Sequence, residues 1–187
     1  MSPGRSTLPG LARLLVLYAF VGVLLAISRP TPALVAAGAA VAGAGEALRV
    51  WAAGHLVKSV RLVTSGPYAY TRNPLYLGRL LILTGLLIAA RLDVRANLAL
   101  LAAAYALFFL YYLPRKERIE GTRLRLRHGD AFARYARVVP RLLPSWRRYP
   151  GEPGGWSARL MARNREPAVA LGLLLVFGLL AWKSAGR

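Results

Sequence analysis

Apolar and polar positions alternate along this chain in long blocks rather than in short strand-like runs. Apolar runs cover residues 11–28, 33–57, 75–90 and 96–113, and a shorter run covers 167–182. Runs of this length are typical of helices that cross a bilayer, which need about 20 mostly apolar residues. We therefore expect an all-α fold: a polytopic membrane helix bundle with about five transmembrane helices and a cytoplasmic amphipathic helix.

The first run has a competing interpretation as a signal peptide. Arg5 and Arg13 precede or open it, as basic residues do in such peptides. The run is nevertheless long for a signal peptide, and Arg29-Pro30 stands where cleavage would occur. We favour a retained transmembrane helix.

The last run follows a Gly- and Pro-rich linker, residues 151–155. Because it is short for a span, an interfacial position is the alternative. We place a membrane core in residues 1–150. Residues 151–187 then form a linker and a C-terminal transmembrane helix.

The second run is rich in alanine and glycine, as helices that pack closely in bilayers tend to be. Its glycines include Gly38, Gly43 and Gly45. Glu46 and Arg49 also lie within it, three residues apart. An ionisable residue at this depth marks a functional site, whereas a Glu46–Arg49 pair on one helix face would serve packing only. Both interpretations stay open.

Residues 115–148 form a basic segment with two distinct helical sides. One side is largely apolar, with Leu124, His128, Phe132, Tyr135 and Val139. The other carries Lys116, Arg123, Arg127, Asp130, Arg134 and Arg137. This pattern predicts an amphipathic helix lying against the membrane or against the bundle.

Composition and charge narrow the class of protein. Hydrophobic residues make up 56% of the 187 residues, which is high for a soluble domain. The net charge of +19 would suggest nucleic-acid binding in a soluble protein. Here the arginines separate membrane-length runs, so we interpret them as topology signals and headgroup contacts, with no nucleic-acid partner. Without cysteine, and with only His55 and His128, the chain offers no convincing metal site.

The distribution of basic residues predicts the orientation. With a cytoplasmic N-terminus, one side carries Arg5, Lys58, Arg61, Arg72 and the basic stretch from Arg115 to Arg165. The other side carries Arg29, Arg91, Arg95, Lys183 and Arg187. The positive-inside rule favours this orientation. In a prokaryote the protein would lie in the plasma or inner membrane.

A polar, aromatic stretch from Gly66 to Gly78 separates two apolar runs. Gly66-Pro67 predicts a turn, and Tyr68 and Tyr70 are expected to point the same way in an extended piece. Asn73-Pro74 is a typical helix start, with asparagine as the N-cap. The free N–H groups of the first turn could bind an anionic group beside Arg72 and Tyr76. The alternative is a well-capped transmembrane helix with interfacial tyrosines.

This stretch resembles the signature of the isoprenylcysteine carboxyl methyltransferase and phospholipid methyltransferase superfamily, G-P-Y followed by R-[H/N]-P-x-Y-x-G. The resemblance implies an integral membrane methyltransferase that uses S-adenosylmethionine. It assigns cofactor contacts to Gly66, Tyr68, Arg72, Asn73, Pro74 and Tyr76. The preceding segment, residues 49–54 with Lys58, also resembles bacterial members. Asn73 replaces the histidine of animal members, so it supplies no group that titrates near neutral pH.

A second, looser match to the same superfamily lies in the basic segment. It comprises Glu120-Gly121, Leu124, His128-Gly129, Phe132, Tyr135 and Val139-Pro140-Arg141. The family has a second glutamate where Gly121 stands, a phenylalanine for His128 and a tyrosine for Phe132. The resemblance implies catalytic and cofactor roles for Glu120, with Glu117 as a nearby spare. The alternative for Glu120 is a surface ion pair with Lys116 or Arg123.

We expect methyl transfer from S-adenosylmethionine to a lipid-like or prenyl-like acceptor, at the cytoplasmic side of the membrane. The acceptor would enter from the bilayer. A carboxylate acceptor is slightly favoured over an amine because arginine holds anions, and Arg141 could orient it. A headgroup contact is the alternative for Arg141. The rival functions are a nicotinamide-dependent membrane reductase of related fold and a non-enzymatic lipid-binding protein.

Overall fold

The computed structural model describes the chain at residues 8–57, 61–151 and 153–186; within the first helix it describes the side chains of Leu15 and of residues from 19 onward. Regular structure in these described ranges is entirely helical. Three of the basic residues used to predict the orientation lie outside the described residues: Arg5, Lys58 and Arg187. Glu152 of the linker does too.

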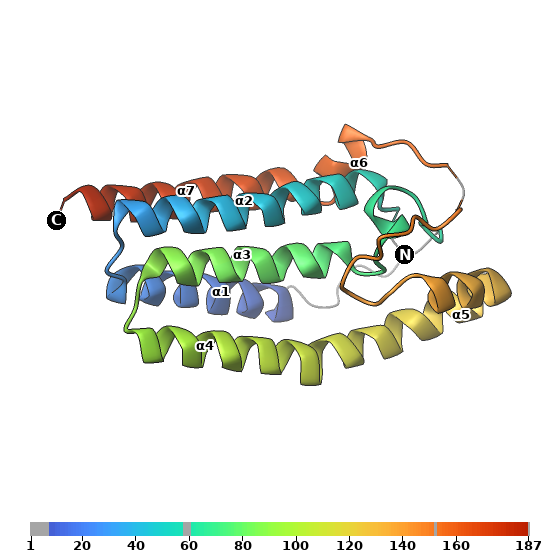
Figure 1. Ribbon diagram of the computed structural model, residues 1–187, viewed down its shortest axis with the longest axis horizontal. Coiled ribbons are helices and arrows are strands. Elements are labelled where there is room, and N and C mark those ends of the chain that lie inside the picture. The colour runs from blue at the N-terminus through green and yellow to red at the C-terminus, as the bar shows by residue number, and fades with distance from the viewer. Residues whose placement is uncertain (1–7, 58–60, 152, 187) are drawn as a thin grey trace.

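Five helices lie side by side along one direction (Figure 1). They are α1 (Leu8–Ile27), α2 (Pro32–His55), α3 (Pro74–Ala90), α4 (Val94–Ala106) and α7 (Glu166–Ala185). The other helical pieces are η1 (Gly66–Ala69), the π-helical η2 (Leu107–Tyr112), α5 (Leu113–Val138) and α6 (Ala158–Arg163). In Figure 1, η1, α5 and α6 gather at one end of the bundle, which we call the site end.

Three helices of the described chain are long and apolar enough to cross a membrane: α2, the continuous helix Val94–Val138, and α7. α3 is a shorter apolar helix of 17 residues. These lengths confirm the coarse prediction of an all-helical membrane protein. That five helices cross the bilayer stays a prediction.

The C-terminal helix is longer than the sequence pattern indicated. α7 has 20 residues rather than the 16 of run 167–182, because it begins at Glu166 and continues past Trp182 through Lys183 to Ala185. A short helix, α6, precedes it where only a linker was expected. This length is enough for a transmembrane helix.

α2 and α3 approach each other closely through small residues. A β-carbon on Gly38 would collide with Gly85 of α3, and one on Gly45 would collide with Gly78. Such contacts let helices in a bilayer gain dispersion energy along their backbones. Gly43, expected to share this role, faces open space instead. The prediction of close packing is therefore confirmed for two of the three glycines.

Gly85→Val should lower the free energy of unfolding by about 1–3 kcal/mol, since the added carbons have no space between the helices. Gly43→Val is the matched control, because it makes the same change of side chain at an open position. Thermal unfolding of both variants in one detergent would measure the difference. Equal destabilisation by the two substitutions would contradict close α2–α3 packing.

The fourth predicted span, residues 96–113, continues as a helix past Pro114. α4 passes into η2, and η2 into α5, without a break. In the π-helical turn the N–H of Leu113 donates to the carbonyl of Phe108, five residues back. We attribute the tolerance of Pro114 to this wider turn, because it shifts the pairing that a proline normally disrupts.

α4 lies at one edge of the bundle (Figure 1). Neither α4 nor η2 contains a buried residue, and α3 lies between α4 and α2 (Figure 1). α4 is tied to α3 by a Thr84–Tyr105 hydroxyl pair at 2.8 Å and by the Asn97 amide, which donates to the Leu87 carbonyl at 3.2 Å. This light attachment leaves most of α4 free to face lipid.

The basic segment differs from the single helix predicted over 115–148. α5 ends at Val138, and Gly129 interrupts it with a non-helical φ of 46°. After this kink, Phe132, Tyr135 and Val139 form a buried cluster with Leu62 and Tyr149. The apolar residues after the kink therefore pack on protein at the site end, whereas Ile119 and Leu126 before it are exposed.

Candidate functional site

The signature stretch begins with a turn that requires glycine. Gly66 has a φ of +58°, and a β-carbon there would collide with the ring of His55. The next residues form the 3-10 helix η1 rather than the predicted extended piece, so Tyr68 is buried while Tyr70 is half-buried. Gly66 itself does not line the cleft described below. Its role in the structure is to shape the backbone.

The segment after α5 forms a strap across the signature stretch. Three backbone N–H groups pair the two segments: Arg72 to Pro140 at 2.9 Å, Ser145 to Tyr70 at 2.8 Å and Tyr149 to Ala69 at 2.9 Å. The buried Thr71 hydroxyl also donates to the Leu142 carbonyl at 2.8 Å. This strap, residues 139–149, fixes the residues that precede α3.

Asn73 occupies the N-cap position of α3, but its side chain makes no capping hydrogen bond. Its amide instead donates to the Arg141 carbonyl at 2.8 Å and to Glu117 Oε1 at 3.3 Å. The predicted capping role is therefore wrong. The side chain joins the strap and α5 to the start of α3.

Glu117 is the centre of the polar cluster. Its carboxylate pairs with Arg141 Nε at 2.8 Å and with Arg72 Nη2 at 3.5 Å, and its side chain is only 16% exposed. The anion beside the start of α3 is thus a carboxylate of the chain itself. Sequence reasoning named Glu117 only as a spare for Glu120.

Glu120 lies one turn along α5 and contacts different partners. The Tyr76 hydroxyl donates to Glu120 Oε1 at 3.3 Å, and Lys116 pairs with the same oxygen at 3.2 Å. The Glu120 side chain is 45% exposed, so its pair with Lys116 is the surface ion pair expected as the alternative from the sequence. The Tyr76 contact, however, also joins Glu120 to the signature stretch.

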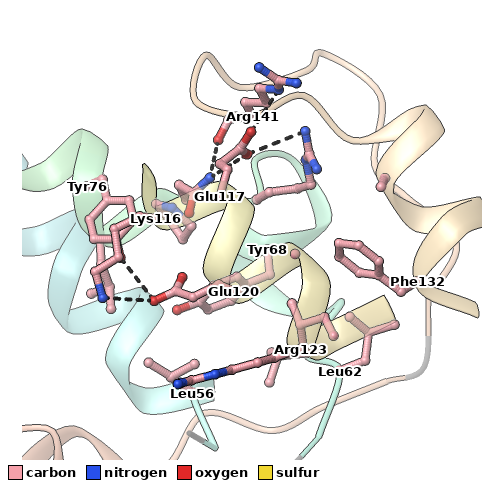
Figure 2. Close-up of a pocket in the computed structure, with 18 of the residues that line it drawn as sticks. Leu56, Leu62, Tyr68, Tyr76, Lys116, Glu117, Glu120, Arg123, Phe132 and Arg141 are labelled. Carbon is pink, nitrogen blue, oxygen red and sulfur yellow. Dashed lines mark hydrogen bonds and ion pairs between the residues drawn. The ribbon is translucent and has the colours of Figure 1, made fainter. Parts of the chain in front are cut away.

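These residues line an open cleft of about 1480 Å³ at the site end. Of the residues assigned from the resemblance, Tyr68, Arg72, Asn73, Pro74, Tyr76, Glu120 and Arg141 line it. In Figure 2, Tyr76, Lys116 and Glu120 lie on one side, Phe132 and Leu62 lie on the other, and Arg123 extends toward Leu56. The cleft therefore combines an acidic and hydroxyl-bearing side with an apolar side.

Tyr68 presents a neutral hydroxyl at the cleft. Its side chain is buried, and this burial raises the pKa of the phenol well above its ordinary value. Its backbone carbonyl accepts a hydrogen bond from the Tyr135 hydroxyl at 2.8 Å, which ties η1 to α5. Tyr68 is thus positioned as a hydrogen-bonding residue and not as a base.

A buried cluster of charged side chains borders the cleft, and the sequence indicated only one of its two ion pairs. Arg49 Nε contacts Glu46 at 3.2 Å, as the three-residue spacing suggested. Arg49 Nη2 also contacts Glu166 of α7, at 2.7 Å. Arg49 and Glu166 line the cleft floor. No pattern in the sequence indicated the contact with Glu166, 117 residues away.

The chain is similar to a curated protein named for metal resistance. The cobalt-zinc-cadmium resistance protein CzcN of Cupriavidus metallidurans is 33% identical to it over 128 residues, which is 67% of this chain. The chain spans about half, 56%, of that relative's length. No family model and no solved structure matches the chain. This similarity alone does not assign a family.

Proposed function

We propose that this protein transfers a methyl group from S-adenosylmethionine to a lipid-like or prenyl-like acceptor at the membrane surface. The observation that carries the proposal is the meeting of two distant segments in one cleft. Asn73 and Tyr76 of the signature contact Glu117 and Glu120 of α5, 44 positions away in each case. The resemblance implied donor contacts in both segments, and the proposal builds on their contact.

The chemistry of the cleft fits the donor. Glu120, partly exposed, can pair with the donor's ammonium or accept from its ribose hydroxyls. Arg72 Nε is buried without a hydrogen-bond partner among the described residues, while Nη2 of the same side chain pairs with Glu117, so Arg72 adds positive charge to this side of the cleft. Leu56, Leu62 and Phe132 provide an apolar wall for an adenine ring.

Bound S-adenosylmethionine supplies an activated methyl group, whose bond electrons remain on sulfur when the group leaves. A carboxylate acceptor becomes a neutral ester and needs no base. An amine acceptor must also lose a proton. Glu120, the exposed carboxylate that contacts Tyr76, is the candidate base that would accept it. In either case the residues of the chain act by holding the reactants in line at near-attack distance.

We also propose that all five long helices cross the membrane, with the site end in the cytoplasm. Arg72 and the arginines of α5 lie at this end, whereas Arg29, Arg91 and Arg95 lie at the other. The positive-inside rule supports this orientation. It places the cleft where S-adenosylmethionine is available.

Two other functions compete with methyl transfer. A reductase of related fold would bind a reduced nicotinamide nucleotide in the same cleft. The name of the relative makes metal resistance a second candidate. Within the described residues no three His, Cys, Asp or Glu side chains are grouped to hold a metal ion, so nothing there favours direct metal binding.

Glu120→Gln should lower the rate of methyl transfer by about tenfold, because it removes the charge that pairs with the donor. The assay would follow tritiated methyl groups from S-adenosylmethionine into lipid extract, using membranes that contain the protein. Asp130→Asn, an exposed substitution on the same helix, is the matched control. Absence of label with the unaltered protein and every lipid fraction would refute the proposed function. Equal rates for the two variants would remove Glu120 from the site.

A further inference from the structure

Arg79 is the one charged residue of α3. It lies five positions after the first residue of the helix, about 7 Å along its axis. Its side chain is exposed on the bundle and also lines the cleft. An arginine in an apolar helix is costly in a bilayer and marks a functional position. The resemblance gave this residue no role.

The contacts of Arg79 are with neutral aromatic groups. Its Nη1 donates to the Tyr112 hydroxyl at 3.2 Å, and its guanidinium lies 5.5 Å from the centre of the Tyr76 ring. Tyr76 in turn packs edge-on against Tyr112 at 5.5 Å between ring centres. The guanidinium is thus held at the cleft by two of its lining residues, rather than extended freely toward lipid headgroups.

Several cations of the cleft already have carboxylate partners. Arg72 and Arg141 pair with Glu117, Lys116 pairs with Glu120, and Arg49 pairs with Glu46 and Glu166. Arg79 has no carboxylate within ion-pair distance in the described part of the chain. Arg118, Arg123, Arg125 and Arg127 of α5 line the cleft without an ion pair among the described residues, as Arg79 does, but Arg79 differs from them in lying on the apolar helix α3. Its positive charge is therefore available to an anion that is not part of the protein.

Arg79 lies where the lining of the cleft includes both α3 and the junction between α4 and α5. Tyr112 belongs to the junction between α4 and α5, and α4 is the exposed, lightly attached helix at the edge of the bundle. Arg79 lies deeper along α3 than Tyr76, whose hydroxyl contacts Glu120. A lipid that moves between α3 and α4 toward the cleft would therefore meet Arg79 before Tyr76 and Glu120.

We propose that Arg79 binds an anionic group, carboxylate or phosphate, on the lipid acceptor and so selects acidic amphiphiles. The acceptor role rests on the proposed function, whereas anion binding at Arg79 can be tested without it. This assignment differs from the expectation for Arg141. The Arg141 side chain is paired with Glu117 and is 70% exposed, on the strap rather than between α3 and α4.

Binding should be measured on the full chain in phosphatidylcholine nanodiscs. The probes are radiolabelled oleate for a carboxylate, oleoyl-lysophosphatidate for a phosphate and oleyl alcohol as the uncharged analogue. Arg79→Gln should weaken binding of at least one anionic probe tenfold or more. Arg79→Lys should retain part of it, and binding of the alcohol should not change. Which anionic probe responds identifies the group.

Two further variants keep the test sharp. Arg95→Gln, an exposed arginine at the opposite end of the bundle, controls for general attraction of anionic lipids. Tyr112→Phe removes the hydroxyl that holds the guanidinium and should weaken anion binding severalfold. Because Tyr112→Phe keeps the charge of Arg79, it provides a second test if Arg79→Gln cannot be purified.

The affinity for S-adenosylhomocysteine separates the two proposals. It should stay within about twofold in Arg79→Gln, because Arg79 is not assigned to the donor. If both anionic probes bind the Arg79→Gln and unaltered proteins equally, the role of Arg79 is refuted. If anion binding depends on Arg79 but S-adenosylhomocysteine does not bind the unaltered protein, the anion site stands and methyl transfer is refuted.

Discussion

Arg49→Leu is expected to lower the free energy of unfolding by about 3–5 kcal/mol. Arg49 lies between Glu46 and Glu166, and the three side chains are at most 12% exposed. Leucine would leave two carboxylates buried without a counter-charge, at the contact between α2 and α7. Reversible unfolding of the detergent-solubilised protein, followed by circular dichroism, would measure the loss.

Two control proteins test this explanation. Arg134→Leu makes the same substitution at an exposed position of α5 and should change stability by less than about 0.5 kcal/mol. Adding Glu46→Gln and Glu166→Gln to Arg49→Leu removes the uncompensated charges and should recover much of the lost stability. If Arg49→Leu were as stable as Arg134→Leu, the ion cluster would have no role in joining α2 to α7.

Glu117→Gln should weaken binding of S-adenosylhomocysteine by about 10- to 100-fold, the value of one or two charge-assisted hydrogen bonds. Without its charge, Arg72 and Arg141 would lose the anion that pairs with both, although the amide oxygen of glutamine could still accept from Asn73. The strap would keep its hydrogen bonds to residues 69–72, but the Arg72 and Arg141 side chains would no longer be fixed to α5, and the donor-binding side of the cleft would lose its shape.

The matched control is Asp130→Asn, which removes one exposed carboxylate from the same helix. It should bind S-adenosylhomocysteine with the affinity of the unaltered protein. Calorimetry on Glu117→Gln and Glu120→Gln also separates the two candidate glutamates. A normal affinity in Glu117→Gln, together with a loss in Glu120→Gln, would show that Glu120 alone provides the acidic contact.

Helix positions could be predicted from the sequence because apolar length and proline placement are local properties. Pro32 and Pro74 lie at helix starts, as expected for residues without an N–H. The apolar run 96–113 and the basic segment 115–148 were expected to be separate helices, but the chain stays helical between them through a π-helical turn before Pro114. The kink at Gly129 precedes Phe132 and Tyr135, whose tertiary contacts periodicity does not reveal.

The site was predictable only as far as a motif marked it. Asn73 and Tyr76 were found through the signature, and Glu120 through the looser match. Glu117 was passed over in favour of Glu120, because the folded positions of Arg72 and Arg141 decide which carboxylate they bind. Contacts between residues far apart in the chain, such as Arg49 with Glu166, require the structure.

The most direct test of the central proposal is calorimetric titration of the unaltered protein with S-adenosylhomocysteine. The protein should be held in nanodiscs that contain lipid extract, so that an acceptor required for binding is present. A parallel titration uses a reduced nicotinamide nucleotide. We predict saturable binding of one S-adenosylhomocysteine per chain and none of the nucleotide. Binding of the nucleotide alone, or of neither molecule, would contradict a methyl-donor site in this cleft.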